Sequence, residues 1–211
     1  MILVEQHQYS KYSKHFKELD NLCFLAKNLY NVTLYHVRQH YFEHKEYLSY
    51  TKINKISNDL FPDDYKALPR KVAQQVQKLV DQNFKSFFNH LKVLKQGERI
   101  NIPQYLHKTD GRQVLTYTNQ AISQNNRNVS KGHIRLSGTT FEIKTNIENV
   151  IFARIVPNKG YITIELGYET QNTEPVEKNN RYASIDIGVN NLATVTSNIF
   201  NPFIVNGKPL K

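Results

Sequence analysis

The residue whose type and surroundings most suggest chemistry is Asp186, in the segment YASIDIGVNNLATVTS at residues 182–197. Apolar and β-branched residues flank it, which predicts a buried strand, and Gly188 with the following Asn pair predicts a tight turn into a second strand. A carboxylate in a buried strand is costly unless it is ion-paired or holds a cation. The segment therefore carries either a structural acid, paired or capping a turn, or a metal ligand.

Two kinds of catalytic site place a carboxylate in this way. In the RNase H-type fold, an acid on the first strand begins a cluster of carboxylates that binds two Mg²⁺ for phosphodiester cleavage. In the nucleotide site of the actin and sugar-kinase type, the first hairpin also carries Asp-x-Gly, because the glycine lets the backbone approach a phosphate. The residues of the motif alone do not separate the two. A phosphotransferase of the second type usually begins with this hairpin, whereas here a long basic region precedes it.

The overall charge favours a polyanionic partner. The 211 residues include 28 Lys and Arg against 18 Asp and Glu, a formal net charge of +10. Such an excess is typical of proteins that bind nucleic acid, and less often of proteins that bind membranes. No stretch is long and apolar enough for a membrane helix, and the N-terminus lacks the features of a signal peptide. We therefore predict a cytoplasmic protein with no membrane partner.

The single cysteine, Cys23, excludes a disulfide within the chain and a Cys-based zinc site. It lies in an apolar helical run, which predicts a core position. No zinc is expected in this chain.

The first half of the chain has the period of helices. Apolar residues recur at three- and four-residue steps from Ser13 to about Glu46, and a second helix is predicted between Ser49 and Pro62. The clearest helix follows Pro69 and ends before Gly97. Its apolar stripe is predicted to consist of Val72, Val76, Leu79, Val80, Phe84, Phe87, Leu91 and Leu94. Its other face carries basic residues, which we take as candidate nucleic-acid contacts: Arg70, Lys71, Lys78 and Lys85, with Lys92 beyond them.

The second half alternates polar and apolar residues, which predicts strands. Residues 151–156 and 161–166, joined by Pro-Asn-Lys-Gly, predict a β-hairpin. Basic and aromatic residues occur together in this region, and cations contact phosphates while tyrosines stack on bases. The further candidate nucleic-acid contacts are Tyr105, Lys108, Arg112, Tyr117, Arg127, Lys131 and Arg135.

These patterns divide the chain into four parts and give an α+β fold class. Residues 1–10 form a first strand that returns to a β-barrel region at residues 99–175, so the helical region at 11–98 is an insertion. A polar linker containing Pro175 then leads to the Asp186 strands at residues 181–211.

In order and spacing, six segments resemble the TnpB/OrfB family of insertion-sequence proteins, relatives of the type V CRISPR effectors. They are AKNLYNVTLYHVR, LPRKVAQQVQKLVDQNFKSFF, INIPQYL, KGHIRLSG, VIFARIVPNKGYITIELGYE and ASIDIGVNNLATVTSN. The resemblance covers nearly the whole chain.

The resemblance implies the N-terminal part of a transposon-associated RNA-guided DNA endonuclease whose partners are guide RNA and target DNA. A helical recognition lobe inserted in a wedge-type β-barrel would grip the nucleic acids, and base pairing would supply sequence specificity. Residues 181–211 would begin a RuvC-like nuclease domain, with Asp186 as the first catalytic acid and a ligand of Mg²⁺.

The chain departs from the family after Asp186. Family members continue with a second and a third acid and a zinc-ribbon cysteine set, whereas no Asp or Glu follows Asp186 here. One carboxylate cannot hold two Mg²⁺, so we expect this chain alone not to cut DNA, with a missing C-terminal nuclease portion as a possible partner. A stand-alone, non-enzymatic RNA- or DNA-binding module is the alternative, and a phosphotransferase is a third, weaker one.

Overall fold

The structure, a computed structural model, describes residues 1–95, 97–124, 129–170, 180–188 and 191–207. These residues form a mixed α/β protein with helices and antiparallel sheets, as the predicted α+β class requires. The chain divides into two compact units, residues 1–170 and residues 171–211. The first unit holds all the described helices.

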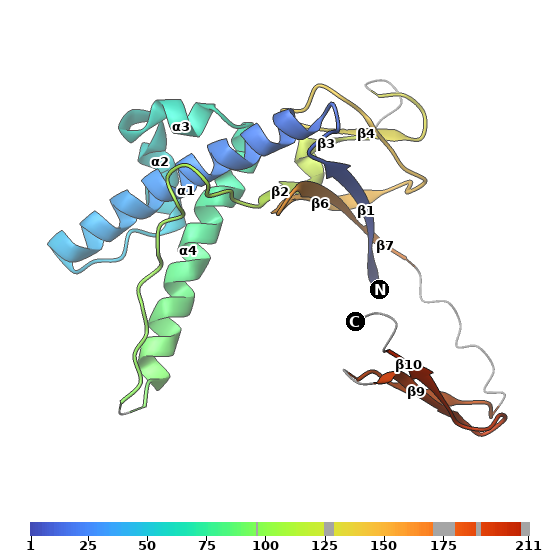
Figure 1. Cartoon of the computed structure of the whole chain (residues 1–211). Helices are drawn as coiled ribbons and strands as arrows, with labels where there is room; N and C mark the ends of the chain where they lie inside the picture. The colour runs from blue at the N-terminus through green and yellow to red at the C-terminus, as the bar shows by residue number, and fades with distance from the viewer. Residues whose placement is uncertain (96, 125–128, 171–179, 189–190, 208–211) are drawn as a thin grey trace. The chain divides into compact units, whose positions relative to one another are not determined.

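The larger sheet of the first unit has the antiparallel strand order β1-β7-β6-β2 (Figure 1). Its strands are β1 (Ile2–Ser10), β2 (Leu115–Thr118), β6 (Val150–Asn158) and β7 (Tyr161–Glu169). β1 pairs with β7 along its whole length, from Ile2 opposite Glu169 to Ser10 opposite Tyr161. The first strand thus lies beside β7, and the helices fall between β1 and β2 in the sequence.

β6 and β7 form the predicted hairpin, but their strands run further into the loop than the sequence indicated. Pro157 and Asn158 belong to β6 and pair with Ile162 and Tyr161. Pro157 is tolerated because β2 pairs with β6 only up to Ile155, so no neighbouring strand needs the missing N–H. Further along β7, the Phe152 ring covers Gly167, where a Cβ would lie 2.1 Å from a ring carbon.

The helices are α1 (Phe16–His44), α2 (Tyr50–Leu60), α3 (Pro62–Lys66) and α4 (Arg70–Val93). Pro62 ends α2 as predicted, but it also occupies the first turn of the short helix α3. α4 ends at Val93, short of Gly97. In the predicted apolar stripe of α4, Val72, Val76, Val80 and Phe84 are buried and Leu79 and Phe87 are partly buried, whereas Leu91 and the C-cap residue Leu94 are exposed.

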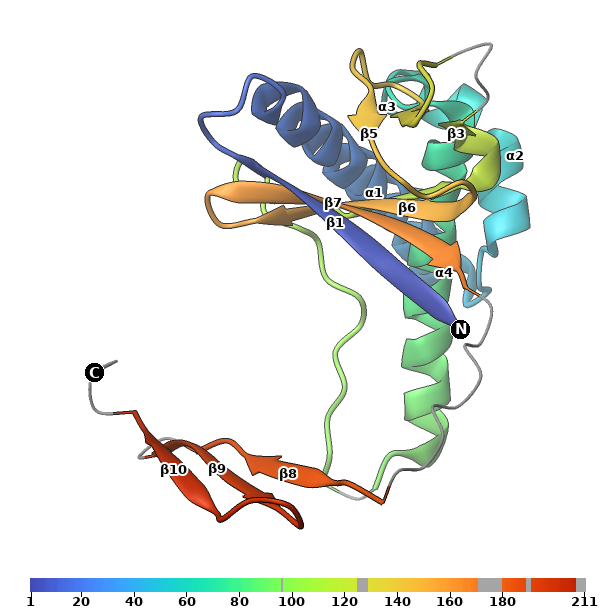
Figure 2. The same ribbon diagram turned by 90° about the vertical axis from the view of Figure 1, so that its right-hand side faces the viewer.

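The helices and the larger sheet share one hydrophobic core. α1 packs on β6 and β7 while α4 packs on β2 (Figures 1 and 2). Fully buried side chains from all of these elements meet there, among them Leu19, Val72, Leu115, Ile155 and Ile164. Cys23 is buried in the same core, as predicted. Each such aliphatic side chain contributes roughly 1.5–3 kcal/mol on burial.

A smaller sheet in the first unit has the strand order β3-β4-β5. Its strands are β3 (Ile122–Ser123), β4 (His133–Leu136) and β5 (Ile143–Lys144), and the 3-10 helix η1 (Asn119–Ala121) connects β2 to β3. Among the described residues β1 and β2 remain the edges of the larger sheet, so a closed barrel stays a prediction.

The second unit is a three-stranded antiparallel sheet in the order β10-β9-β8. Its strands are β8 (Ala183–Asp186), β9 (Asn191–Ser197) and β10 (Phe203–Asn206). β8 and β9 are the two strands predicted around Asp186, which lies opposite Thr194. β10 was not anticipated: Phe203–Val205 are apolar, but the Asn201-Pro202 pair directly before them is a turn signal. The linker with Pro175 lies outside the described residues.

Candidate nucleic-acid interface

Helix α4 exposes a row of basic side chains. Arg70 and Lys71 begin the helix, and Lys78, Lys85 and Lys92 follow Lys71 at two-turn intervals, which places the lysines on one stripe. All five side chains are exposed. The stripe is therefore accessible to a polyanion along the whole helix.

The one acid of α4, Asp81, is drawn into the fold. Its Oδ1 accepts hydrogen bonds from the Tyr47 hydroxyl at 2.6 Å and from the Tyr50 backbone N–H at 2.8 Å. Lys85 Nζ lies 2.6 Å from its Oδ2. Burial alone would raise the pKa of Asp81, but these three donors outweigh it and hold the pKa below its usual value. Asp81 is only 7% exposed, so it offers little repulsion to a phosphate.

Residues 99–112, which we call the strap, run antiparallel to α1 without forming a helix or strand. The Asn31 side chain pairs with the backbone of Leu106 in both directions, each bond 2.9 Å long. Lys27 Nζ donates to the Lys108 carbonyl at 2.6 Å, and Arg38 donates to the Pro103 carbonyl at 3.4 Å. Side chains of α1 therefore bind main-chain atoms at three points of the strap.

The strap is closed at its end by an ion pair. Arg112 donates to both carboxylate oxygens of Asp20, at 2.7 and 2.8 Å, and its Nη1 donates to the carbonyls of Thr109 and Gly111. This bidentate pair raises the pKa of Arg112. Four of the five N–H groups of Arg112 are thus bonded within the chain, and its predicted phosphate contact stays a prediction.

The other strap candidates face solvent. The Lys108 side chain is exposed, and only its carbonyl is bound by α1. Tyr105 is 44% exposed, with the Arg38 guanidinium 4.9 Å from its ring centroid. An aromatic ring and two cations are thus available beside α1.

Two candidates fall elsewhere. Tyr117 is fully buried in β2, with its hydroxyl unpaired, so the predicted stacking on a base does not fit its place in the core. The alternation of β2 decides this, because Leu115 and Tyr117 both face the helices. Arg127 lies outside the described residues.

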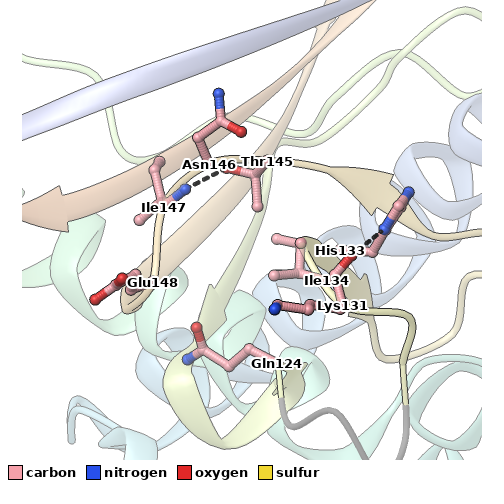
Figure 3. A pocket seen from close by; sticks show the side chains of 9 residues that line it. Gln124, Lys131, His133, Ile134, Thr145, Asn146, Ile147 and Glu148 are labelled. Atoms are coloured by element: carbon pink, nitrogen blue, oxygen red, sulfur yellow. Dashed lines mark hydrogen bonds between the residues drawn. The ribbon is translucent and has the colours of Figure 1, made fainter.

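Lys131 lines a cavity of about 530 Å³ beside the β4–β5 sheet (Figure 3). His133, Thr145, Asn146 and Glu148 also line it, and Gln124 pairs with the Val150 backbone in both directions at its edge. Arg135 follows His133 by two residues on β4, which places both on the same side of the strand. The charged residues that line the cavity are one lysine, Lys131, and one carboxylate, Glu148, so the predicted phosphate contact by Lys131 stays a prediction.

Asp186 does not lie in a buried strand. All four residues of β8 are exposed within their unit, so the predicted desolvation cost is absent. In the described part of the second unit, Asp186 is the only carboxylate, and no group of three His, Cys, Asp or Glu side chains suited to a metal occurs in the described residues. The residues at this site therefore do not fit a pair of Mg²⁺ ions.

The sequence reading missed the α1 residues that hold the strap. Asp20, Lys27, Asn31 and Arg38 are spaced seven, four and seven residues apart, which places them on one helical face. A polar row at this spacing, on a helix with a separate apolar stripe, was the available signal.

None of the described helices is both long and apolar enough to cross a membrane. No protein-family model matches the chain, and no curated protein matches it.

Several solved structures are similar to the chain, and two of them are described here. A CRISPR-Cas12f ternary complex aligns with 95% of this chain and 49% of its own, at 11% identity and a TM-score of 0.42. A Cas12f1-sgRNA-target DNA complex aligns with 99% of this chain and 58% of its own, at 12% identity and a TM-score of 0.38. The chain thus spans about half the length of the structures it matches, and these values are too low to assign it to a family.

Proposed function

We propose that this chain binds nucleic acid through the lysine stripe of α4 and the strap. The observation that carries the proposal is that Lys71, Lys78, Lys85 and Lys92 form one exposed row while the only acid of the helix is buried and bonded. The strap and α4 also border a groove of about 280 Å³, lined by Asn83 and Phe87 on one side and Asn101 and Gln104 on the other; the lysines of the stripe are not among its lining residues, so stripe and groove are separate surfaces. Phosphates supply the charge that such a surface binds.

The finer form of the proposal follows from the resemblance to the TnpB/OrfB family. In that form the chain is the N-terminal part of an RNA-guided DNA endonuclease, its partners are guide RNA and target DNA, and Mg²⁺ acts only in a complete nuclease. Copurification of the chain followed by sequencing of the bound RNA tests it. A defined transposon-end transcript would support this form, and absence of bound nucleic acid at low salt would contradict nucleic-acid binding altogether.

A second candidate is a non-enzymatic binding module. The specific observation in its favour is that Asp186 is exposed and has no second carboxylate near it in the described part of its unit. In this case the bound RNA would be protected or sequestered and not used as a guide.

Neutralising the lysine stripe should weaken binding and reduce its salt dependence. Each phosphate contact contributes about 0.7–0.9 to the slope of log affinity against log salt concentration. For Lys71→Gln, Lys78→Gln and Lys92→Gln combined, we therefore expect the slope on a single strand or duplex to fall by about 2, measured by fluorescence anisotropy. The triple variant Lys14→Gln, Lys17→Gln and Lys159→Gln, at exposed positions away from α4, is the matched control. An equal loss of slope in both variants would show that net charge, and not the stripe, binds the polyanion.

We expect no Mg²⁺-dependent DNA cleavage by this chain alone. A two-metal site needs several carboxylates, and the described Asp186 site offers one. The measurement is incubation of the chain, its copurified RNA and supercoiled DNA with Mg²⁺, followed by electrophoresis. Specific cutting by the unaltered chain that is lost in Asp186→Ala would contradict this expectation.

A further inference from the structure

A second surface of the helical region combines aromatic rings with cations. A groove of about 530 Å³ lies where the last turns of α1 and α4 meet the chain between α1 and α2. We call it the aromatic groove, and its lining residues are Tyr41, Lys45, Tyr47, Phe88, Leu91 and Lys92. Its volume lies within the range of about 300–1,000 Å³ that is usual for small-molecule sites.

The rings of the groove are fixed before any ligand arrives. The Phe88 ring lies 5.5 Å from the ring of Tyr41 and 5.5 Å from that of Tyr47, measured between centroids. The Tyr47 hydroxyl is bonded to Asp81, and Phe84 and Phe87 pack against Phe88 from the core side. The rings of Tyr41, Tyr47 and Phe88 remain partly exposed. A planar ligand can therefore stack on them at little cost in side-chain entropy.

Lys45 holds its place at the groove in an unfavourable backbone conformation. It caps α1 with φ 56° and ψ 17°, and its N–H donates to the Tyr41 carbonyl at 2.9 Å. This left-handed position normally belongs to glycine, because a Cβ is strained there. Here the position is occupied by a lysine, which puts an ammonium group at the rim of the groove.

The charged side chains that line the groove are both lysines. Lys45 and Lys92 are exposed, and neither ammonium has a partner among the described residues. No carboxylate is among the lining residues. The rim thus complements an anion, while the floor is aromatic and apolar.

We propose that the aromatic groove stacks an unpaired base of a single-stranded nucleic acid, with Lys45 and Lys92 contacting the flanking phosphates. The combination of a stacking floor and a cationic rim is the one that sequence-tolerant single-strand binding uses. An acidic peptide would also meet the lysines, but it would not need three planar rings. The inference rests on the proposed nucleic-acid binding. It adds that this site binds an unpaired base together with the phosphates on either side of it.

The test compares a short oligothymidylate with an abasic strand of the same length, each titrated into the chain by fluorescence anisotropy. We expect the unaltered chain to bind the base-bearing strand about tenfold more tightly than the abasic one. Tyr41→Ala should remove most of this preference while leaving affinity for the abasic strand in place. Lys45→Gly should weaken binding to both strands, although its thermal midpoint should equal or exceed that of the unaltered chain because the backbone strain is relieved.

Lys55→Ala, at an exposed position of α2, removes the same charge outside the groove and is the matched control. If the unaltered chain binds both strands equally, the stacking site is wrong while nucleic-acid binding stands. If it binds neither strand, the proposed function itself fails. An acidic peptide is titrated in the same way. If the chain binds this peptide without losing either strand, and Tyr41→Ala abolishes the peptide binding, the groove is a peptide site and the inference is overturned.

Discussion

Asp81→Ala should destabilise the first unit by about 2–3 kcal/mol, because it leaves the Tyr50 N–H without its acceptor and leaves the Tyr47 hydroxyl only its longer bond, 3.3 Å, to the Asp81 carbonyl. Each buried donor left unsatisfied costs about 1–3 kcal/mol, and Lys85 loses its partner as well. Urea unfolding followed by circular dichroism gives the free energy of unfolding. Asp59→Ala, an exposed carboxylate on α2, is the control and should change stability by no more than about 0.5 kcal/mol.

The same residue should make stability sensitive to acid. The folded-state pKa of Asp81 lies below its unfolded value of about 3.9, so its stabilising effect is complete above that value and is lost as pH falls through the folded pKa. The difference in unfolding free energy between the unaltered chain and Asp81→Ala should therefore shrink as pH falls below about 4. A difference that stays constant to the lowest pH tested would contradict the ionised, hydrogen-bonded state of Asp81.

Leu115→Ala should destabilise the helices and the sheet together, by roughly 2–5 kcal/mol. Leu115 is fully buried on β2, where α4 packs, and its side chain belongs to the core that both regions share. Native-state hydrogen exchange should show amides of α1 and β7 losing protection by the same free energy. Leu60→Ala, at a position 48% exposed on α2, is the control.

Loss of protection confined to β7, with α1 unchanged, would contradict the shared core. It would mean that the inserted helices fold independently of the sheet into which they are inserted, as a separate domain does.

The larger elements could be predicted from the sequence because each has a strong local period. The stripe from Val72 to Phe84 identified α4, and the alternation on either side of Lys159-Gly160 identified the β6–β7 hairpin. The return of the first strand to the β region was also predicted, but not that its partner is β7, at the opposite end of the first unit.

The candidate site was less predictable, because burial and side-chain partners depend on tertiary packing. Tyr117 is a tyrosine like Tyr105, yet it lies in the core. Arg112 is a cation like Lys108, yet it is bound by Asp20. The aromatic groove had no signal in any single segment, since it joins the ends of two helices far apart in sequence. Asp186 was expected in a buried strand on local hydrophobicity alone, and its unit exposes both faces of β8.

The path of the strap does not depend on most of its own side chains. Asn31, Lys27 and Arg38 all bind main-chain groups of the strap: every residue type presents the carbonyl in the same way, and every type except proline presents the N–H. The position of the strap along α1 is thus fixed by side chains of α1. Substitutions at Gln104, Tyr105 and Lys108 should therefore leave the backbone of the strap in place. Ligand preference at this surface can therefore diverge between relatives, or be re-engineered, by substitutions in a few exposed positions on an unchanged scaffold.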